Sequence, residues 1–351
     1  MLLVSGCGGL VEDDRAASGG GPGSSDPSSG TSSPVCSDRS LKPIATIDST
    51  AVAVATDAAF AYLALRGTPG AHDGSIVKVP LAGGSPVTIS SGDESPMGLA
   101  LDAASVWFTS GGASHGAGVI TRVGKDGSGK SVQARGLEWP NGIAVDDGAV
   151  YWAEGGNGDG SSAPDDRAGA RVMRLEKSTG ETSALAIRQR NPESVAVDAT
   201  HVYWTNSGGA MGAAGGVMRV SKTGGAPQIL AAADDAIPAT YPSSGVALSA
   251  TDVFWTSTKS GRVMAVPKLG GAPRELSREL EGPLSIATDA TFVYWTNPWT
   301  RRVLRAPLGG GPVETIVESR MAPWAISTTS DRVFVTNYVN GGSFDSTCKP
   351  R

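Results

Sequence analysis

The sequence predicts an all-β fold built from a repeated unit of four short strands. One five-residue strand with an aromatic second position is written seven times. Its clear copies are Val150–Glu154, Val202–Asn206, Val253–Ser257 and Val293–Asn297, and its degraded copies are Ala61–Leu65, Val106–Ser110 and Val333–Asn337. The turns before these strands recur every 40 to 52 residues, and four strands in roughly 40–50 residues is the period of a propeller blade. We therefore predict a seven-bladed β-propeller of four-stranded antiparallel blades.

The aromatic strand indicates how the units stack. Val202, Tyr203 and Trp204 point alternately to opposite faces of a sheet, yet all three are apolar. A strand that is apolar on both faces must be covered on both. Stacking each blade between two neighbours provides that cover, whereas a two-sheet sandwich would leave one face alternating with polar residues.

The other strands of a unit are clearest around the copy at Val202–Asn206. An apolar strand at 194–198 precedes it, and a tight turn at 198–201 joins the two. A third strand at 216–220 and a glycine hairpin at 222–225 lead to a fourth strand at 227–230. Short strands joined by glycine turns agree with the composition, which has 48 glycines and 18% charged residues.

Strand counting predicts how the ring closes. The third and fourth strands occur together only six times, because the seventh unit ends near Asn337 with a short piece at 341–344. An orphan strand, Pro43–Ile47, precedes the first unit. We expect it to complete the seventh blade as its outer edge, which removes open edges. A six-bladed ring with one rudimentary copy is the alternative.

The chain begins with Met1–Cys7, an apolar run followed by two small residues and a cysteine. This segment resembles the cleavage site of bacterial lipoproteins, in which the cysteine becomes the lipid-bearing N-terminus. The resemblance implies that Cys7 is acylated and that the protein is anchored in the bacterial cell envelope, on the outer membrane or the periplasmic face. Only six residues precede Cys7, so residues 1–7 would be the truncated remnant of a longer signal. A chance Gly-Cys near a cytoplasmic start is the alternative.

Residues 8–38 form a predicted linker, and residues 39–348 form the propeller. The stretch 16–35 is almost entirely Ser, Gly, Pro and Ala, which cannot bury enough apolar surface to offset its ordering entropy. We expect a flexible tether, with a disordered tail that has no anchor as the alternative. If lipid takes Cys7, then Cys36 and Cys348 remain, and we predict that they form a disulfide in an oxidising compartment.

The combination of Val202–Asn206 with the third strand Gly216–Val220 resembles the YWTD-type propeller repeat. The wider similarity is to extracytoplasmic propellers of the NHL, TolB-like and gluconolactonase kind, and it covers residues 41–346. It implies the architecture and leaves the chemistry open. The final Asp of the repeat is replaced here by Asn206, Asn297, Asn337, Glu154 or Ser257.

Candidate site residues follow the aromatic strands. The loops after these strands and the loops that lead into the next blade share one edge of the ring, which we call the variable rim because their lengths differ. Asn141, in a Pro-Asn-Gly segment, resembles the metal-ligand asparagine of gluconolactonase-like enzymes, and Glu154 lies on the same rim. Their oxygens could bind Ca²⁺, although a turn asparagine is the alternative for Asn141.

Two further sets lie on that rim. The loop 157–166 contains alternating oxygen-bearing residues and glycines, which suggests part of a calcium loop or a solvated loop. Asn206, Asn297 and Asn337, together with Trp299 and Trp324, either line a polar binding rim or cap neighbouring backbone groups.

A ring of basic residues occupies one position of the third strand. We expect these residues to pair with the turn aspartates between blades, with a polyanion site as the alternative. They are Lys78, Arg122, Arg174, Arg219 and Arg305.

These patterns favour a lipid-anchored, non-catalytic scaffold that binds an unknown protein or small ligand on the variable rim. The net charge of −5 argues against a nucleic-acid binder. No stretch of about 18 apolar residues predicts a membrane span, so we expect membrane contact through the lipid alone, and a monomer. The alternative is a Ca²⁺-dependent hydrolase or lyase of the gluconolactonase-like type that uses Asn141 and Glu154, and Ca²⁺ is the only cofactor considered.

Overall fold

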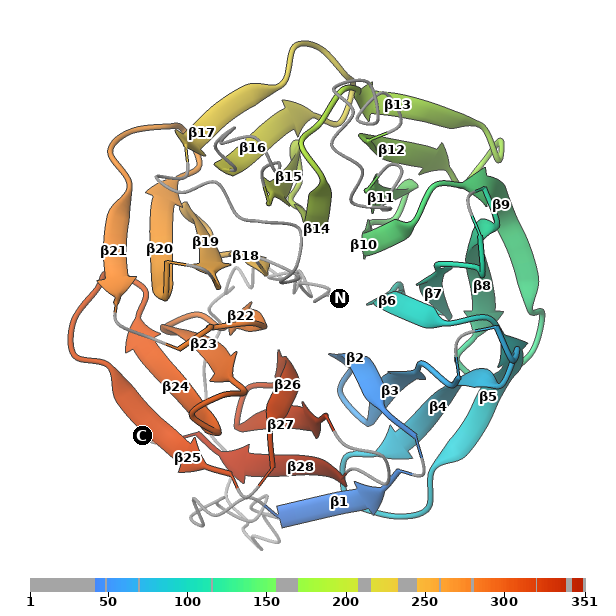
Figure 1. The fold of residues 1–351 in the computed structure, drawn as a ribbon, viewed down its shortest axis with the longest axis horizontal. Helices are drawn as coiled ribbons and strands as arrows, with labels where there is room; N and C mark the ends of the chain where they lie inside the picture. The colour runs from blue at the N-terminus through green and yellow to red at the C-terminus, as the bar shows by residue number, and fades with distance from the viewer. Residues whose placement is uncertain are drawn as a thin grey trace, which may run out of the picture.

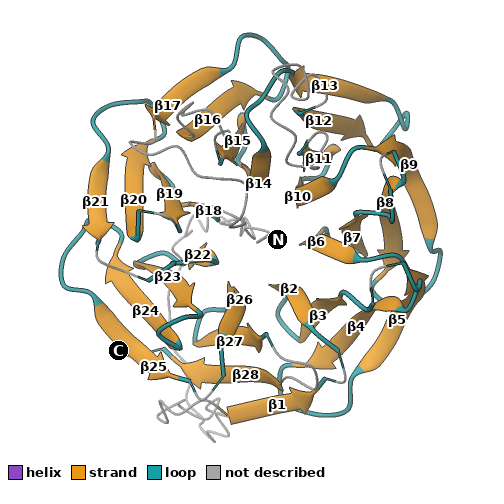
Figure 2. Ribbon diagram, viewed as in Figure 1, coloured by secondary structure: helices purple, strands orange, loops and turns teal. Residues whose placement is uncertain are grey.

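The computed structural model describes residues 42–47, 49–68, 70–114, 116–155, 170–207, 216–232, 245–258, 260–278, 281–319, 321–338 and 343–349. Within these ranges the chain forms strands and turns, and no helix there is long and apolar enough to cross a bilayer. The strands form seven four-stranded antiparallel sheets that stand as blades around a central axis (Figure 1, Figure 2).

Each blade runs from an inner strand at the axis to an outer strand at the circumference (Figure 1). The first three blades consist of β2 (Ala51–Thr56), β3 (Phe60–Leu65), β4 (Gly74–Pro80) and β5 (Val87–Asp93); β6 (Pro96–Leu101), β7 (Ser105–Ser110), β8 (Gly118–Gly124) and β9 (Ser131–Leu137); and β10 (Pro140–Val145), β11 (Ala149–Glu154), β12 (Arg171–Glu176) and β13 (Thr182–Ala186). The next three consist of β14 (Pro192–Val197), β15 (His201–Asn206), β16 (Gly216–Ser221) and β17 (Gln228–Ala232); β18 (Val246–Leu248), β19 (Asp252–Ser257), β20 (Arg262–Pro267) and β21 (Arg274–Ser277); and β22 (Ile286–Thr288), β23 (Phe292–Asn297), β24 (Arg302–Pro307) and β25 (Glu314–Glu318).

The seventh blade joins the two ends of the described chain. It contains β26 (Pro323–Thr328), β27 (Arg332–Asn337), β28 (Ser343–Cys348) and, at its outer edge, β1 (Lys42–Thr46). Strand β1 pairs antiparallel with β28, with Lys42 opposite Ser346 and Thr46 opposite Ser343. The predicted seven-bladed ring and its closure by the orphan strand are therefore confirmed, and the six-bladed alternative is wrong.

The core lies between the blades, as the two-sided apolar strand predicts. Tyr203 packs with residues of the fourth and fifth blades, whereas Trp204 packs with residues of the third and fourth. Both side chains are buried. Adjacent positions of one strand thus face different neighbours, and each blade is covered on both sides.

Small residues let the inner strands approach one another around the axis. A Cβ atom added to Gly142 would lie 2.5 Å from the carbonyl oxygen of Glu193 in the next blade. Thr109 bridges two blades near this level, because its Oγ1 accepts from the Gly98 amide at 2.8 Å and donates to the Asn141 carbonyl at 2.8 Å. The inner strands are therefore positioned by backbone contacts.

The predicted boundaries fall at the edge of the described chain. The first described strand begins at Lys42 and the last ends at Cys348. Residues 1–41 lie outside the described residues, so the signal remnant, the linker and the acylation of Cys7 stay predictions.

We expect Gly142→Ala to lower the free energy of unfolding by about 1–3 kcal/mol, because the new methyl group would overpack the contact between inner strands. Chemical denaturation monitored by tryptophan fluorescence measures the effect. Gly309→Ala is the matched control, since a Cβ atom there meets no atom within 4 Å. Equal effects of the two substitutions would contradict this account of the inner strands.

Candidate functional site

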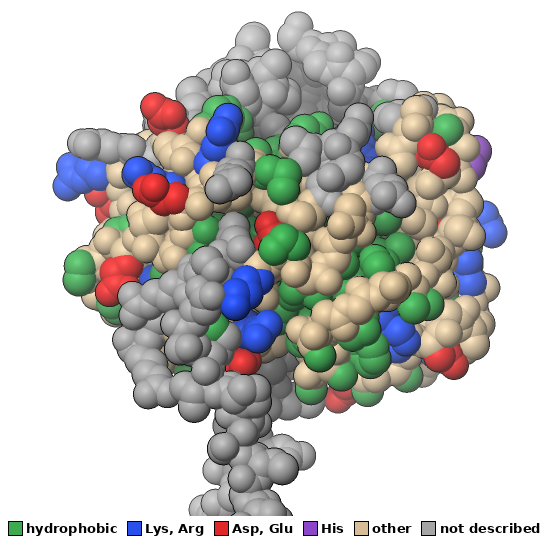
Figure 3. All heavy atoms as spheres, turned by 90° about the horizontal axis from the view of Figure 1, so that it is seen from below, with side chains coloured by type: hydrophobic (Ala, Val, Ile, Leu, Met, Phe, Trp, Pro, Cys, Tyr) green, Lys and Arg blue, Asp and Glu red, His purple; other side chains and the backbone are tan. Residues whose placement is uncertain are grey.

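The two edges of the ring are built differently. We call the edge opposite the variable rim the regular rim; it carries the turns between first and second strands and the hairpins between third and fourth strands. Over the side face shown in Figure 3, acidic and basic side chains are interspersed.

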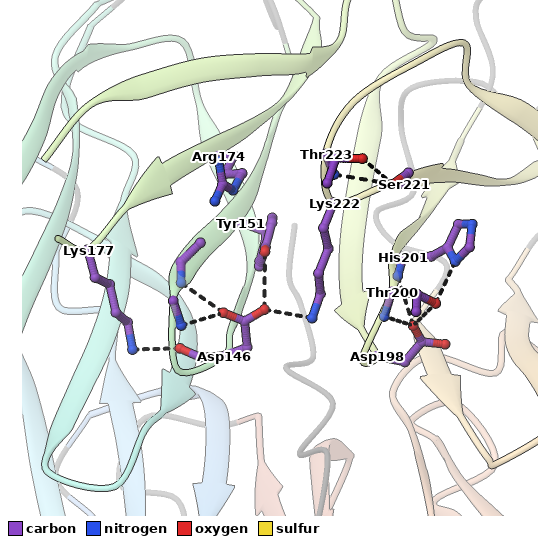
Figure 4. Close-up of polar contacts among 12 residues, drawn as sticks. Asp146, Tyr151, Arg174, Lys177, Asp198, Thr200, His201, Ser221, Lys222 and Thr223 are labelled. Carbon is purple, nitrogen blue, oxygen red and sulfur yellow. Dashed lines mark hydrogen bonds and ion pairs between the residues drawn. The ribbon is translucent and has the colours of Figure 1, made fainter. Parts of the chain in front are cut away.

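On the regular rim, each turn aspartate organises a small polar unit, shown for Asp146 in Figure 4. Its Oδ1 accepts hydrogen bonds from the backbone amides of Gly148 at 2.9 Å and Ala149 at 2.8 Å. Its Oδ2 accepts from the Tyr151 hydroxyl at 3.1 Å and pairs with Lys222 Nζ of the next blade at 2.7 Å. The carboxylate therefore closes its own turn and ties two blades together.

This Asp–aromatic–Lys triad recurs at five of the seven blade junctions, with Lys–Asp distances from 2.6 to 3.1 Å. The triads are Asp57–Tyr62–Lys125, Asp102–Trp107–Lys177, Asp146–Tyr151–Lys222, Asp198–Tyr203–Lys268 and Asp289–Tyr294–Lys349.

The other two junctions change all three positions together. Ser249, Phe254 and Leu308 stand at the junction of the fifth and sixth blades, and Thr329, Phe334 and Leu81 stand at the junction of the seventh and first blades. The two leucines keep the backbone role of the lysines, because Leu81 N donates to Ala59 O as Lys125 N donates to Ala104 O. Where the lysine is lost, the carboxylate and the aromatic hydrogen-bond donor are lost as well.

The expected pairing of the third-strand bases with the turn aspartates is wrong. The aspartates pair instead with lysines of the hairpins, one strand end farther along the chain. Arg305 pairs with Glu314 at 2.8 Å, and Arg174 pairs with Glu176. The sequence signal that predicts the correct partner is the lysine directly after the third strand, which recurs in five blades.

The triads perturb the ionisation of their members. Burial raises the pKa of Asp146, but the hydrogen bond from Lys222 and those from the turn amides outweigh it, so that the net pKa lies below the ordinary value. Burial and the adjacent Asp146 carboxylate raise the pKa of Tyr151 to about 12. At neutral pH the aspartate is charged and the tyrosine is protonated, as the hydrogen bond between them requires.

The variable rim holds the predicted site residues, and Glu154 is buried within it. The Glu154 side chain has no exposed surface. Its Oε1 accepts from Trp152 Nε1 at 2.9 Å, and its Oε2 accepts from Arg171 Nη2 at 2.9 Å and from the Glu138 amide at 3.2 Å. Both carboxylate oxygens are used inside the protein, and Asn141 is not among these partners.

Asn141 lies instead beside residues of the fourth blade. It is 2% exposed, and a Cβ atom added to Gly155 would lie 3.6 Å from Asn141 Nδ2 and 2.9 Å from Asn191 Oδ1. Asn191 Nδ2 donates to Glu193 Oε1 at 3.2 Å. Three oxygen-bearing side chains thus gather where the third and fourth blades meet.

Among the described residues, no group of three or more His, Cys, Asp or Glu side chains could hold a metal ion. The loop 157–166, where part of a calcium loop was a possible reading, lies outside the described residues.

The three strand-end asparagines point into the protein. Asn206 Nδ2 donates to Gln189 Oε1 at 3.2 Å, and Asn337 Nδ2 donates to Asp345 Oδ2 at 2.7 Å. Asn297 Oδ1 accepts from the Thr300 amide at 3.2 Å. These contacts match the capping interpretation, although each amide keeps one buried polar atom without a partner.

Aromatic side chains, by contrast, are exposed on the variable rim. Trp299 is 48% exposed, and Tyr338 is 45% exposed. Tyr338 stacks on Trp324 with 4.4 Å between ring centroids. Tyr338 was not among the predicted residues, although its place directly after Asn337, at the end of the aromatic strand, marks it as a rim residue.

The predicted cysteine roles cannot be joined to this geometry. Cys348 is 7% exposed at the end of β28. Cys7 and Cys36 lie outside the described residues, so both the lipid attachment and the Cys36–Cys348 disulfide stay predictions.

No protein-family model and no curated protein matches the sequence. Three solved β-propellers are similar in structure. Streptogramin B lyase has a TM-score of 0.67 and 12% identity, covering 88% of this chain and 97% of that one. A chain of a nidogen–laminin complex has a TM-score of 0.51 and 18% identity, covering 67% and 86%. A gluconolactonase from Xanthomonas campestris has a TM-score of 0.50 and 16% identity, covering 72% and 86%. At these identities the similarity establishes the fold alone.

We expect Lys222→Leu to lower the free energy of unfolding by about 1–2 kcal/mol, because it leaves the partly buried Asp146 carboxylate without its counterion. The triple variant D146S/Y151F/K222L reproduces the composition of the junction between the fifth and sixth blades. It should recover at least half of the loss in urea denaturation. A triple variant less stable than K222L would contradict the idea that the three positions act as a set.

The triads also predict an alkaline transition. A tyrosine whose folded pKa lies above the unfolded value of about 10 stabilises the fold below pH 10 and loses that contribution as pH rises toward 12. We expect Tyr151→Phe to reduce the fall in unfolding free energy between pH 10 and 12. The lowered pKa of Asp146 acts at the other end, where stability falls as pH drops below about 4. Identical alkaline slopes for Y151F and the parent protein would exclude this role for Tyr151.

Proposed function

We propose that the protein is a lipid-anchored, extracytoplasmic β-propeller that binds a protein or small ligand on its variable rim without catalysing a reaction. The observation that carries the proposal is the contrast on that rim between polar and aromatic side chains. Glu154 and Asn337 are buried and hydrogen-bonded within the blades. Trp299 and Tyr338 are about half exposed.

Exposed aromatic side chains on a rigid scaffold favour recognition. Tryptophan and tyrosine are enriched among residues that dominate interface affinity, because they offer a large contact area with few rotatable bonds. Here the stack of Tyr338 on Trp324 pre-orders one of them. Binding then requires little additional ordering of the side chains.

The alternative is a Ca²⁺-dependent hydrolase or lyase of the gluconolactonase-like type. The gathering of Asn141, Asn191 and Glu193 favours it, because amide and carboxylate oxygens are the ligands that calcium prefers. Glu154, the other residue expected in this role, would have to leave Arg171 and Trp152 first.

A pull-down from detergent-solubilised cell envelope tests the proposed binding function. We expect the parent protein to retain a specific partner and Trp299→Ala/Tyr338→Ala to lose at least tenfold of it, because truncating central aromatic residues removes most of an interface's affinity. Leu269→Ala is the control, since Leu269 is 91% exposed on the regular rim. A partner retained equally by all three proteins would locate binding elsewhere.

Calcium distinguishes the alternative. On the scaffold proposal, millimolar Ca²⁺ leaves the melting temperature of the parent protein unchanged within error. A ligand that binds only the native state raises the melting temperature, so a rise that disappears in Asn141→Ala/Glu193→Gln would favour the enzyme.

A further inference from the structure

The variable-rim end of the sixth blade contains buried donors that have no acceptor. Trp295 Nε1 and Asn297 Nδ2 are shut off from solvent and have no hydrogen-bond partner, and the same holds for Thr300 Oγ1. Trp295 is 0% exposed, and Asn297 is 1% exposed. The orientation of the Asn297 amide is set by the Thr300 backbone amide, which donates to its Oδ1. The free Nδ2 is therefore a donor.

The third blade shows what fills this place when the chain supplies the acceptor itself. Trp152 and Glu154 occupy the positions of Trp295 and Asn297 in the aromatic strand. There the Glu154 carboxylate accepts from Trp152 Nε1 at 2.9 Å and from Arg171 Nη2 at 2.9 Å. A carboxylate between an indole N–H and a guanidinium completes this place in the third blade.

The fourth blade shows that the same two donors converge on one oxygen. Trp204 Nε1 donates to Gln189 Oε1 at 3.1 Å, and Asn206 Nδ2 donates to the same atom at 3.2 Å. Trp204 and Asn206 correspond to Trp295 and Asn297. In the sixth blade this donor pair is kept, and no described residue supplies the oxygen.

The sixth blade also keeps the arginine of the third. Arg302 pairs with Asn297 across the strands as Arg171 pairs with Glu154. Its guanidinium instead contacts Glu318 at 3.0 Å, where the two side chains are 46% and 71% exposed. An exposed ion pair of this kind contributes little, so Arg302 can exchange Glu318 for another anion.

Trp299 lies beside this place and is open on the rim. A Cβ atom added to Gly282 would lie 2.7 Å from the indole ring, so the ring packs directly on the glycine backbone. Nearly half of the side chain remains exposed. A flat group bound at the rim could stack on it.

We propose that the sixth blade binds a small molecule in which a carboxylate is attached to a flat, apolar ring. The carboxylate takes the place that Glu154 holds in the third blade, accepting from Trp295 Nε1 and Asn297 Nδ2 with Arg302 as counter-charge, and the ring stacks on Trp299. Access requires a shift of the rim loop that carries Trp299, because neither donor atom is open to solvent. This inference rests on the proposed binding function and names its ligand class.

Benzoate is the probe, followed through the indole N–H signals of the full protein in ¹H–¹⁵N spectra, with Trp295→Phe identifying the Trp295 signal. We expect a saturable downfield shift of that signal at pH 7 and at least tenfold weaker binding of the neutral analogue benzamide. Arg302→Ala should weaken benzoate binding at least tenfold. Arg278→Ala is the control, because that side chain is 72% exposed and lies on a different strand end.

Asn297→Glu provides a second test, since it rebuilds the carboxylate of the third blade inside the sixth. We expect it to abolish the benzoate response. No saturable shift with benzoate, or an equal response to benzamide, would overturn the proposal and leave an ordered water as the acceptor. If benzoate does not bind while W299A/Y338A still loses the envelope partner, the carboxylate site fails and the proposed binding function stands.

Discussion

Each blade has two apolar faces, and covering both is the constraint on which the rest of the molecule depends. Tyr203 and Trp204 are neighbours in one strand, yet they pack against different blades. An open stack would always leave two faces exposed, so only a closed ring satisfies every blade. The number of copies and the pairing of β1 with β28 both follow from that need.

Closure brings polar groups into the junctions, and each junction satisfies them as a set. On the regular rim, an aspartate occurs only where a lysine from the next blade reaches it, because a partly buried carboxylate is unfavourable without a counterion. Where leucine replaces lysine, serine or threonine replaces the aspartate. On the variable rim the third and fourth blades satisfy their indole N–H groups with Glu154 and Gln189. The sixth blade does not, and that difference is what singles it out.

The architecture could be predicted because it depends on local properties of the sequence. The period and the two-sided aromatic strand are visible within a single unit, and the orphan strand at 43–47 follows from counting. The site could not be predicted to the same depth, because it depends on contacts between distant residues. Glu154 is an obvious oxygen donor in the sequence, but Arg171, which neutralises it, follows a long loop. Lys222 reaches Asp146 from another blade, and only a comparison of equivalent positions among the units indicates that pairing.

The position of β1 has a consequence for how the protein reaches its native state. This strand is synthesised before any blade, yet its partner β28 is made last. The first described strand must therefore wait, unpaired, until almost the whole chain has been made. Contacts between such distant segments slow folding and leave a strand edge available for pairing with other molecules in the meantime. The ring is thus assembled late and as a whole, so that a chain halted before its last strand would carry an open blade at each end.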